Sequence, residues 1–175
     1  AGEATIGFSH GSSGEKYTFG ANGTTLMVLD ANSKISLSNN DGGNTGNTIF
    51  GKSAWNNSSN NGSDYNTIFG ELTMGTGAVN GAAYNVGVGY KALTDVTSAD
   101  SCVAIGALAL ENCTEGNFNI AVGYRAGDAI TTGDDNIFIG TDAGGSSQDV
   151  DKATIIGHGA GGGVLDSGAD GSVFI

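Results

Sequence analysis

The sequence has few of the residues from which a compact globular core is built. Its 175 residues include no proline, one tryptophan and two methionines, whereas glycine accounts for 32 of them. No stretch approaches the ~18–20 apolar residues of a membrane span, and no signal peptide is recognisable. We therefore expect no membrane insertion, and because the chain lacks an initiating methionine we interpret it as a fragment or a processed product.

Basic residues are also scarce. Six Lys and Arg against 18 Asp and Glu give a formal net charge of −12. Affinity for nucleic acid depends on cations that neutralise phosphates, and anionic lipid surfaces attract basic segments. The charge therefore argues against nucleic acid and against an anionic membrane surface as partners.

Cysteine and histidine are too few for a metal centre of the usual spacing. Cys102 and Cys113 fall within one repeat, and the two histidines, His10 and His158, lie in different segments. At the phase of Cys113, the other repeats carry Val96, Ile130 and Val164. We predict a small buried hydrophobe there, in preference to a disulfide or a zinc site, and we expect no metal and no cofactor.

What the sequence does contain is a repeat, typified by Asn-Ile-Ala-Val-Gly at residues 119–123. The closing glycines of this pattern stand at 51, 70, 89, 106, 123, 140 and 157, at spacings of 17 or 19 residues. A short period with one strand-like core per unit is typical of a solenoid. We predict an all-β fold, a parallel β-solenoid or β-roll with 17–19-residue coils, in which residues 47–175 make seven full repeats and a truncated eighth.

Three columns of this repeat carry nearly uniform residues. Positions are counted from the first residue of the pattern, so that residue 119 is position one and residue 123 is position five. Position one is usually Asn, which predicts a side-chain amide ladder between coils, although Cys102 and Ala153 depart from it. Position five is always Gly, which indicates positive φ or a backbone too crowded for Cβ. Position eight is small, apart from Thr73, which predicts a tightly packed wall.

Positions two, three and four form a strand that is apolar on both faces, so both faces should be buried. If positions two and four face the interior of the coil, position three is left for a contact between chains. Cyclic symmetry makes such a like-with-like contact natural, and we predict a homotrimer about a common axis. The predicted trimer seam comprises Ile49, Ile68, Gly87, Ala104, Ala121, Phe138, Ile155 and Phe174.

Residues 1–46 do not follow the repeat and form a separate predicted segment. Residues 16–19, 25–29 and 34–38 are predicted strands, separated by turns at 21–23 and 30–33. Residues 39–46 are a Gly/Asn linker. We interpret the segment as a small β module or adaptor that starts the solenoid.

The repeat resembles two related protein classes. Residues 119–123 together with Ala126 resemble the head repeats of trimeric autotransporter adhesins, which form a left-handed parallel β-roll trimer. The 17-residue period, with Tyr-Lys-Ala-Leu at 90–93 and Tyr-Arg-Ala-Gly at 124–127, is more similar to repeats of bacteriophage tail fibres and tailspikes. Residues 25–35 resemble the strand-turn-strand element that precedes such repeats in phage fibres. The resemblance implies a fibre architecture and does not define a site.

No catalytic constellation stands out, so we do not expect an enzyme. A glycan-cleaving tailspike would need two carboxylates across a bond. The available acidic pairs are Asp134/Asp135, Asp149/Asp151 and Asp166/Asp170, which lie in predicted turns. We interpret them as solvated charge, with calcium binding as a less favoured alternative.

Aromatic side chains at outward-looking positions are the candidates for receptor or glycan binding, because rings can anchor a partner at an interface. These candidates are Tyr90, Tyr124, His158, Tyr65, Tyr84, Trp55 and Phe118. The alternative is that they cover contacts between coils or between chains.

Three functions follow from these observations. The leading prediction is a structural fibre protein in a virion tail, a shaft or receptor-binding segment that attaches to a host-cell glycan or protein receptor and joins other tail proteins. The second is the head of a trimeric adhesin on a bacterial surface. The third is a single-chain, ice-binding-like solenoid, which would need a regular Thr-x-Thr column, whereas Thr48, Thr67 and Thr154 are scattered.

Overall fold

The computed structural model describes residues 4–11, 14–21, 24–29, 35–36, 46–55, 62–75, 79–163, 165 and 167–175. The chain divides into two compact units, Ala1–Asp41 and Gly42–Ile175. Within the described ranges, no helix has the length and apolar character that a membrane crossing requires.

The first unit contains an antiparallel sheet in the order β1-β2-β3-β4. Its strands are β1 (Ala4–Gly11), β2 (Gly14–Ala21), β3 (Thr24–Leu29) and β4 (Ile35–Ser36). The last three confirm the predicted strands, whereas β1 was missed although Ile6 and Phe8 alternate with Thr5, Gly7 and Ser9. The predicted turn at 30–33 lies outside the described residues, as do most of the turn at 21–23 and of the linker at 39–46.

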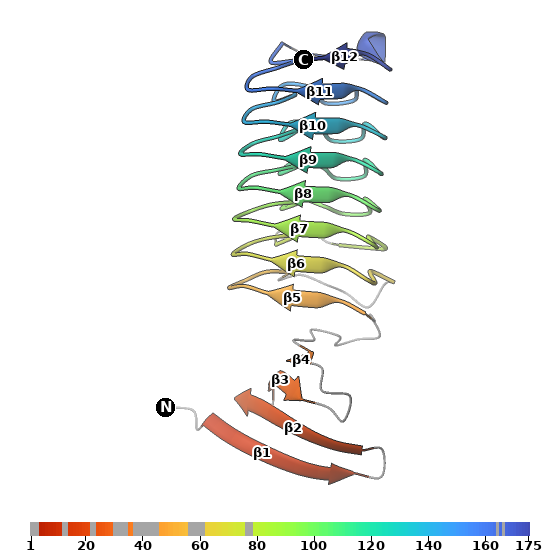
Figure 1. Ribbon diagram of the computed structural model, residues 1–175. Helices are drawn as coiled ribbons and strands as arrows, with labels where there is room; N and C mark the ends of the chain where they lie inside the picture. Colours follow the sequence, from red (N-terminus) through yellow and green to blue (C-terminus); the bar gives the residue numbers. More distant parts are fainter. Residues whose placement is uncertain are drawn as a thin grey trace. The chain divides into compact units, whose positions relative to one another are not determined.

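The second unit is a parallel solenoid with one short strand per coil (Figure 1). The eight strands pair in sequence order, and equivalent repeat positions lie side by side, as with Phe138, Ala121 and Ile155. The strands are β5 (Thr48–Phe50), β6 (Thr67–Phe69), β7 (Val86–Val88), β8 (Val103–Ile105), β9 (Ile120–Val122), β10 (Ile137–Ile139), β11 (Thr154–Ile156) and β12 (Val173–Phe174). A short 3-10 turn, η1 (Ser167–Ala169), precedes β12. The predicted β-solenoid is confirmed.

Glycine at position five is required by both conformation and space. Gly89 has φ 136°, a region that L side chains rarely adopt, and a Cβ there would lie 2.5 Å from the carbonyl oxygen of Gly106 in the next coil. The chain turns sharply at this column directly after each strand, so the coils stack closely.

The position-one asparagines form a buried ladder, and most of its bonds reach the backbone. The Asn119 Oδ1 accepts a hydrogen bond from the Asn136 backbone N–H at 3.0 Å, and the Asn119 Nδ2 donates to the Gly133 carbonyl at 2.7 Å. Amide-to-amide bonds also occur, from Asn136 Nδ2 to Asn119 Oδ1 at 3.0 Å. The predicted ladder is present, and most of its hydrogen bonds are made to buried backbone N–H and carbonyl groups inside the coil.

The predicted trimer seam is wrong, because position three lies inside the coil of its own chain. Ile68, Ala121 and Phe138 are all 0% exposed in the isolated chain and therefore cannot touch a second chain. Ala104 and Ile155 are equally buried, Gly87 is buried, and Ile49 and Phe174 pack against the same core. Side chains alternate along a strand, so positions one, three and five share the inner face, and positions two and four point outward.

Candidate functional site: the outer face of the sheet

Each coil presents a row of alternate residues to the outside. They stand at positions two and four of the strand, at position zero, just before the pattern, and at position six, just after its glycine. In the β9 coil this row is Phe118, Ile120, Val122 and Tyr124, of which Phe118 is 58% and Tyr124 50% exposed. The intervening residues are Asn119 and the other inward side chains described above. Stacking the rows from β5 to β12 makes one continuous face, which we call the outer face.

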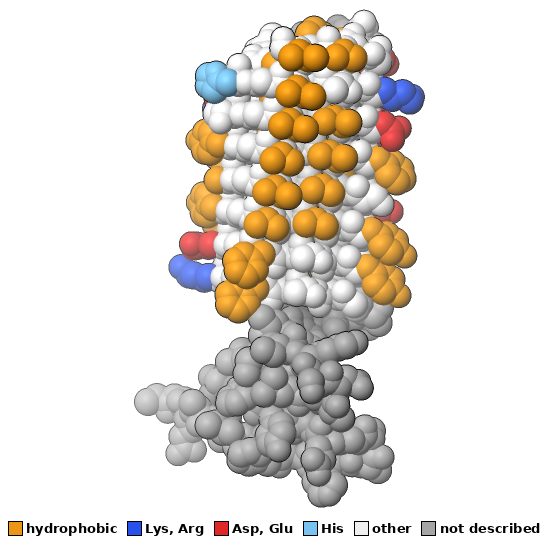
Figure 2. Space-filling model, viewed as in Figure 1, with side chains coloured by type: hydrophobic (Ala, Val, Ile, Leu, Met, Phe, Trp, Pro, Cys, Tyr) orange, Lys and Arg blue, Asp and Glu red, His pale blue; other side chains and the backbone are white. Residues whose placement is uncertain are grey.

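The middle of the outer face is apolar over most of its length. Figure 2 shows two columns of hydrophobic side chains running along this face. Ile105, Ile120, Ile139 and Ile156 are 37–41% exposed. At the β5 end, Phe50 and Phe69 are more than half exposed and stack on each other, with ring centroids 5.0 Å apart and planes 7° from parallel. Water therefore contacts a large apolar surface on the isolated chain.

Two further columns border the outer face. The leading margin, at position zero before each strand, comprises Gly46, Tyr65, Tyr84, Ser101, Phe118, Asp135 and Lys152. The trailing margin, at position six after each strand, comprises Lys52, Glu71, Tyr90, Ala107, Tyr124, Thr141 and His158. Both columns include large aromatic or charged side chains, and Figure 2 shows such side chains projecting along the two edges of the face.

Six of the seven predicted aromatic or histidine candidates lie on these margins. Tyr65, Tyr84, Tyr90, Phe118 and Tyr124 are 48–60% exposed, and His158 is also exposed. Tyr65 and Tyr84 stack along the leading margin with centroids 5.2 Å apart and planes at 13°. The ammonium group of Lys91 lies 5.8 Å from the centre of the Tyr90 ring. The candidates therefore form two lines on opposite sides of one face.

The seventh candidate, Trp55, was wrongly assigned to the surface. Its side chain is 2% exposed and belongs to the core cluster. Trp55 occupies position nine, the column that Met74, Leu93 and Leu110 fill in the following coils, all of them 0% exposed. The matching phase of these apolar residues was the signal that it belongs to the core.

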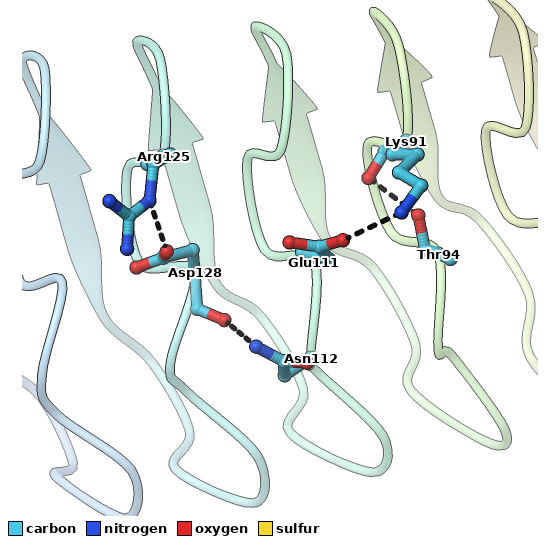
Figure 3. Close-up of polar contacts among 6 residues, drawn as sticks. All are labelled: Lys91, Thr94, Glu111, Asn112, Arg125 and Asp128. Carbon is cyan, nitrogen blue, oxygen red and sulfur yellow. Dashed lines mark hydrogen bonds and ion pairs between the residues drawn. The ribbon is translucent and has the colours of Figure 1, made fainter.

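Polar contacts tie neighbouring coils together away from the outer face (Figure 3). Lys91 reaches Glu111 of the next coil, with 3.4 Å between Nζ and Oε1, and the Asn112 amide donates to the Asp128 carbonyl oxygen at 2.6 Å. Arg125 Nε lies 2.7 Å from Oδ2 of the nearly buried Asp128, which raises the pKa of the Arg125 guanidinium. These contacts stabilise the coil and show no arrangement of acid, base and nucleophile.

The turn aspartates form a second ladder, so the interpretation of Asp134 and Asp151 as merely solvated charge was wrong. Asp134 Oδ1 accepts from the Asn117 backbone N–H at 2.6 Å, and Asp151 Oδ1 accepts from that of Asp134 at 2.8 Å. Asp170 continues the pattern at 2.9 Å. Asp166 lies outside the described residues. Within the part of the chain that the structure describes, no three His, Cys, Asp or Glu residues gather in a way that could hold a metal ion.

The two cysteines are buried, unbonded and close to each other. Both thiols donate to the Gly116 carbonyl, from Cys102 at 3.2 Å and from Cys113 at 3.3 Å. A side-chain hydrogen bond with Cys102, together with burial, raises the pKa of the Cys113 thiol well above its ordinary value. Cys102 thus replaces the amide donor that Asn supplies at this position in other coils, and the pair has a structural role.

Comparison with known proteins found no similar protein: no family model, no curated sequence and no solved structure matches the chain. The outer face is therefore interpreted from its own geometry. It is the one surface among the described residues where apolar columns, stacked rings and mixed margins run together along the whole sheet.

Proposed function

We propose that residues 46–175 form a shaft segment of a homotrimeric fibre, in which the outer faces of three chains pack around a common axis. The fibre serves in attachment to a host cell, as the resemblance to phage tail fibres implies. The observation that carries the trimer is the apolar outer face. Apolar patches of this extent on soluble chains mark sites of association.

Packing the outer faces together removes the apolar columns from water. Each Å² of apolar surface that is buried stabilises the assembly by roughly 25 cal/mol. The contributing side chains include Phe50, Phe69, Ile105 and Ile139, each 39–55% exposed in the single chain. Backbone hydrogen bonds between neighbouring coils are already made, so association needs no further ordering of the strands.

The width of the outer face favours three chains over four. From the bend at position zero to the bend at position five, five steps of about 3.3 Å make a face roughly 16 Å wide. Three such faces set as the sides of a triangle put each backbone about 5 Å from the axis, half the ~10 Å between packed sheets. Four faces set as a square would stand about 8 Å from the axis and leave a channel that Val and Ile side chains do not fill.

An ice-binding or similar flat-ligand role receives less support. Thr48 and Thr67 point outward, but the other central position in their coils is Phe50 or Phe69. The regular hydroxyl array that such a role requires is therefore missing from the described outer face.

Two aspartate substitutions in neighbouring residues test the proposal. Ile120→Asp places charge on the outer face and should abolish trimers while the single chain stays folded, as measured by light scattering and circular dichroism. Ala121→Asp places charge inside the coil and should unfold it. Thr132→Asp, in an exposed turn, is the control. A protein with Ile120→Asp that keeps the mass and thermal stability of the wild type would contradict the proposed interface.

Attachment is tested separately, by binding of the labelled trimer to an array of bacterial surface glycans and to intact bacterial cells. Saturable binding supports the attachment role. A trimer that binds none of them contradicts attachment and leaves the shaft role intact.

A further inference from the structure

The two margins of the outer face carry similar residues in three consecutive coils, β7 to β9. In the β7 coil both margins are tyrosine, Tyr84 and Tyr90, and in the β8 coil both are small, Ser101 and Ala107. In the β9 coil both are again aromatic, Phe118 and Tyr124. The β10 coil follows with the short polar pair Asp135 and Thr141, and the β6 coil pairs a phenol with a carboxylate in Tyr65 and Glu71.

Contacts within one chain do not explain this matching. The margins of a coil lie beyond opposite ends of its strand, about 16 Å apart, so the two members of a pair do not touch. Within each margin, side chains contact one another along the column, as in the stack of Tyr65 on Tyr84 and the ion pair of Lys52 with Glu71.

Rotational symmetry brings the members of each pair together. When copies of one chain are related by an axis parallel to the stack of coils, equivalent coils lie at the same height. The leading margin of one copy then lies beside the trailing margin of the next, with each coil facing its equivalent. Residues matched within a coil become residues matched across the contact.

We propose that the margins close the contact between copies, with the leading margin of each chain packed against the trailing margin of its neighbour, coil for coil. Rings meet rings at the β7 and β9 levels, and a close approach occurs between them, at Ser101 and Ala107. The Tyr65 hydroxyl meets the Glu71 carboxylate as a hydrogen-bond donor. This inference rests on the proposed trimer. It identifies the residues that form the contacts where the edges of two neighbouring outer faces meet.

Two levels depart from the matching. Gly46 and Lys52 at the β5 level differ in size and charge, and Lys152 and His158, both exposed, face each other at the β11 level and offer no complementary charge. The contact is therefore weaker at β5 and β11 and strongest from β7 to β9. A second consequence is that Tyr84, Tyr90, Phe118 and Tyr124 lie between copies in the fibre and are not free to bind a glycan.

Cysteine cross-linking at the closest level tests the pairing. Ser101→Cys and Ala107→Cys are introduced together, and the purified protein is oxidised briefly with copper phenanthroline. The two new cysteines of one chain are too far apart to bond each other, because a disulfide needs Cα atoms within about 7 Å. We expect covalent trimers on a non-reducing denaturing gel, whereas the native Cys102 and Cys113 are buried and should give none in the wild type.

An offset pair is the matched control. Ser101→Cys with Thr141→Cys joins the β8 level to the β10 level, about 10 Å apart along the stack, and should not cross-link. If the first pair fails to fold by circular dichroism, Asp135→Cys with Thr141→Cys gives the same test at the β10 level.

The outcomes separate this inference from the proposed trimer. Cross-links in the level pair and not in the offset pair support the inference. A trimeric mass with no cross-link in either level pair, or with cross-links only in the offset pair, overturns the margin contact and keeps the trimer. A monomeric mass of the wild type overturns both.

Discussion

Phe138 occupies the space into which a side chain on Gly144 would project. A Cβ built on Gly144 collides with the Cδ1 and Cε1 atoms of the Phe138 ring, and one on Gly127 of the preceding coil would lie 2.6 Å from its Cδ2. The ring is thus held between two position-nine glycines. In the β7 and β8 coils the sizes are reversed, with Leu93 and Leu110 at position nine and Gly87 and Ala104 at position three.

This relationship predicts that Gly144→Ala destabilises the solenoid. The added methyl clashes with the fully buried Phe138 ring, and the residue has φ +66°, so an unfolding free energy lower by about 1–3 kcal/mol is expected. Gly163→Ala is the control, since a Cβ there meets nothing within 4 Å. Chemical denaturation measures both, and equal stabilities of the two variants would contradict the packing described.

Loss of one ladder amide should be costly. Asn119→Ala leaves the Asn136 backbone N–H and the Gly133 carbonyl without their buried partners. Each unsatisfied group costs about 1–3 kcal/mol, so we expect the free energy of unfolding, measured by chemical denaturation, to fall by roughly 2–6 kcal/mol. Asn80→Ala, at an exposed asparagine, should change stability by less than about 0.5 kcal/mol. A variant at 119 that matched the one at 80 would mean that the ladder contributes little.

Positive φ at non-glycine positions predicts a stabilising substitution. Ser53 is exposed and has φ 54°, and Gly159 occupies the same column in the β11 coil. Ser53→Gly should therefore stabilise the fold by up to about 1 kcal/mol, because an L residue in this region is strained. Ser98→Gly is the matched control, at an exposed serine without positive φ, and should destabilise by about 0.5–1 kcal/mol. Thermal unfolding measures the stability change of both variants. If both raised stability, or both lowered it, the positive φ of Ser53 would not be the source of strain.

The ion pair of Arg125 should matter more than that of Lys52. Removing Arg125 leaves the nearly buried Asp128 carboxylate without its partner at 2.7 Å, so Arg125→Ala is expected to lower the melting temperature measurably. Lys52 Nζ and Glu71 Oε1 are 3.4 Å apart, and the two side chains are 82% and 48% exposed. Lys52→Ala should therefore leave the melting temperature unchanged. The reverse order of effects would show that burial of Asp128 is not the deciding factor.

The phase of the repeat could be predicted from the sequence, but the direction of its faces could not. Gly at position five and small residues at position eight fix where each coil turns, which was enough to predict the strands around Ile120 and Ile137. The strand is apolar on both faces, so hydrophobicity alone does not tell the inner face of Ala121 from the outer face of Ile120. The buried Asn119 was the available signal, because position one points to the same side as position three.

Residues in the left-handed region were also beyond prediction. Lys91, Leu93, Tyr84 and Phe118 all have φ between 55° and 62°, and none is a residue type that favours it. The stacking of identical coils holds them there through bonds such as Leu93 N–H to the Ala109 carbonyl at 3.1 Å. Trp55 shares this conformation, with φ 47°, and its side chain lies in the core.

The most direct test of the central claim is the solution mass of the wild-type chain, measured by light scattering on a sizing column over a range of concentrations. Packing of three outer faces about one axis predicts a mass three times that of the chain, unchanged on dilution. A folded, thermally stable monomer would contradict it and would show that the apolar outer face remains open to water.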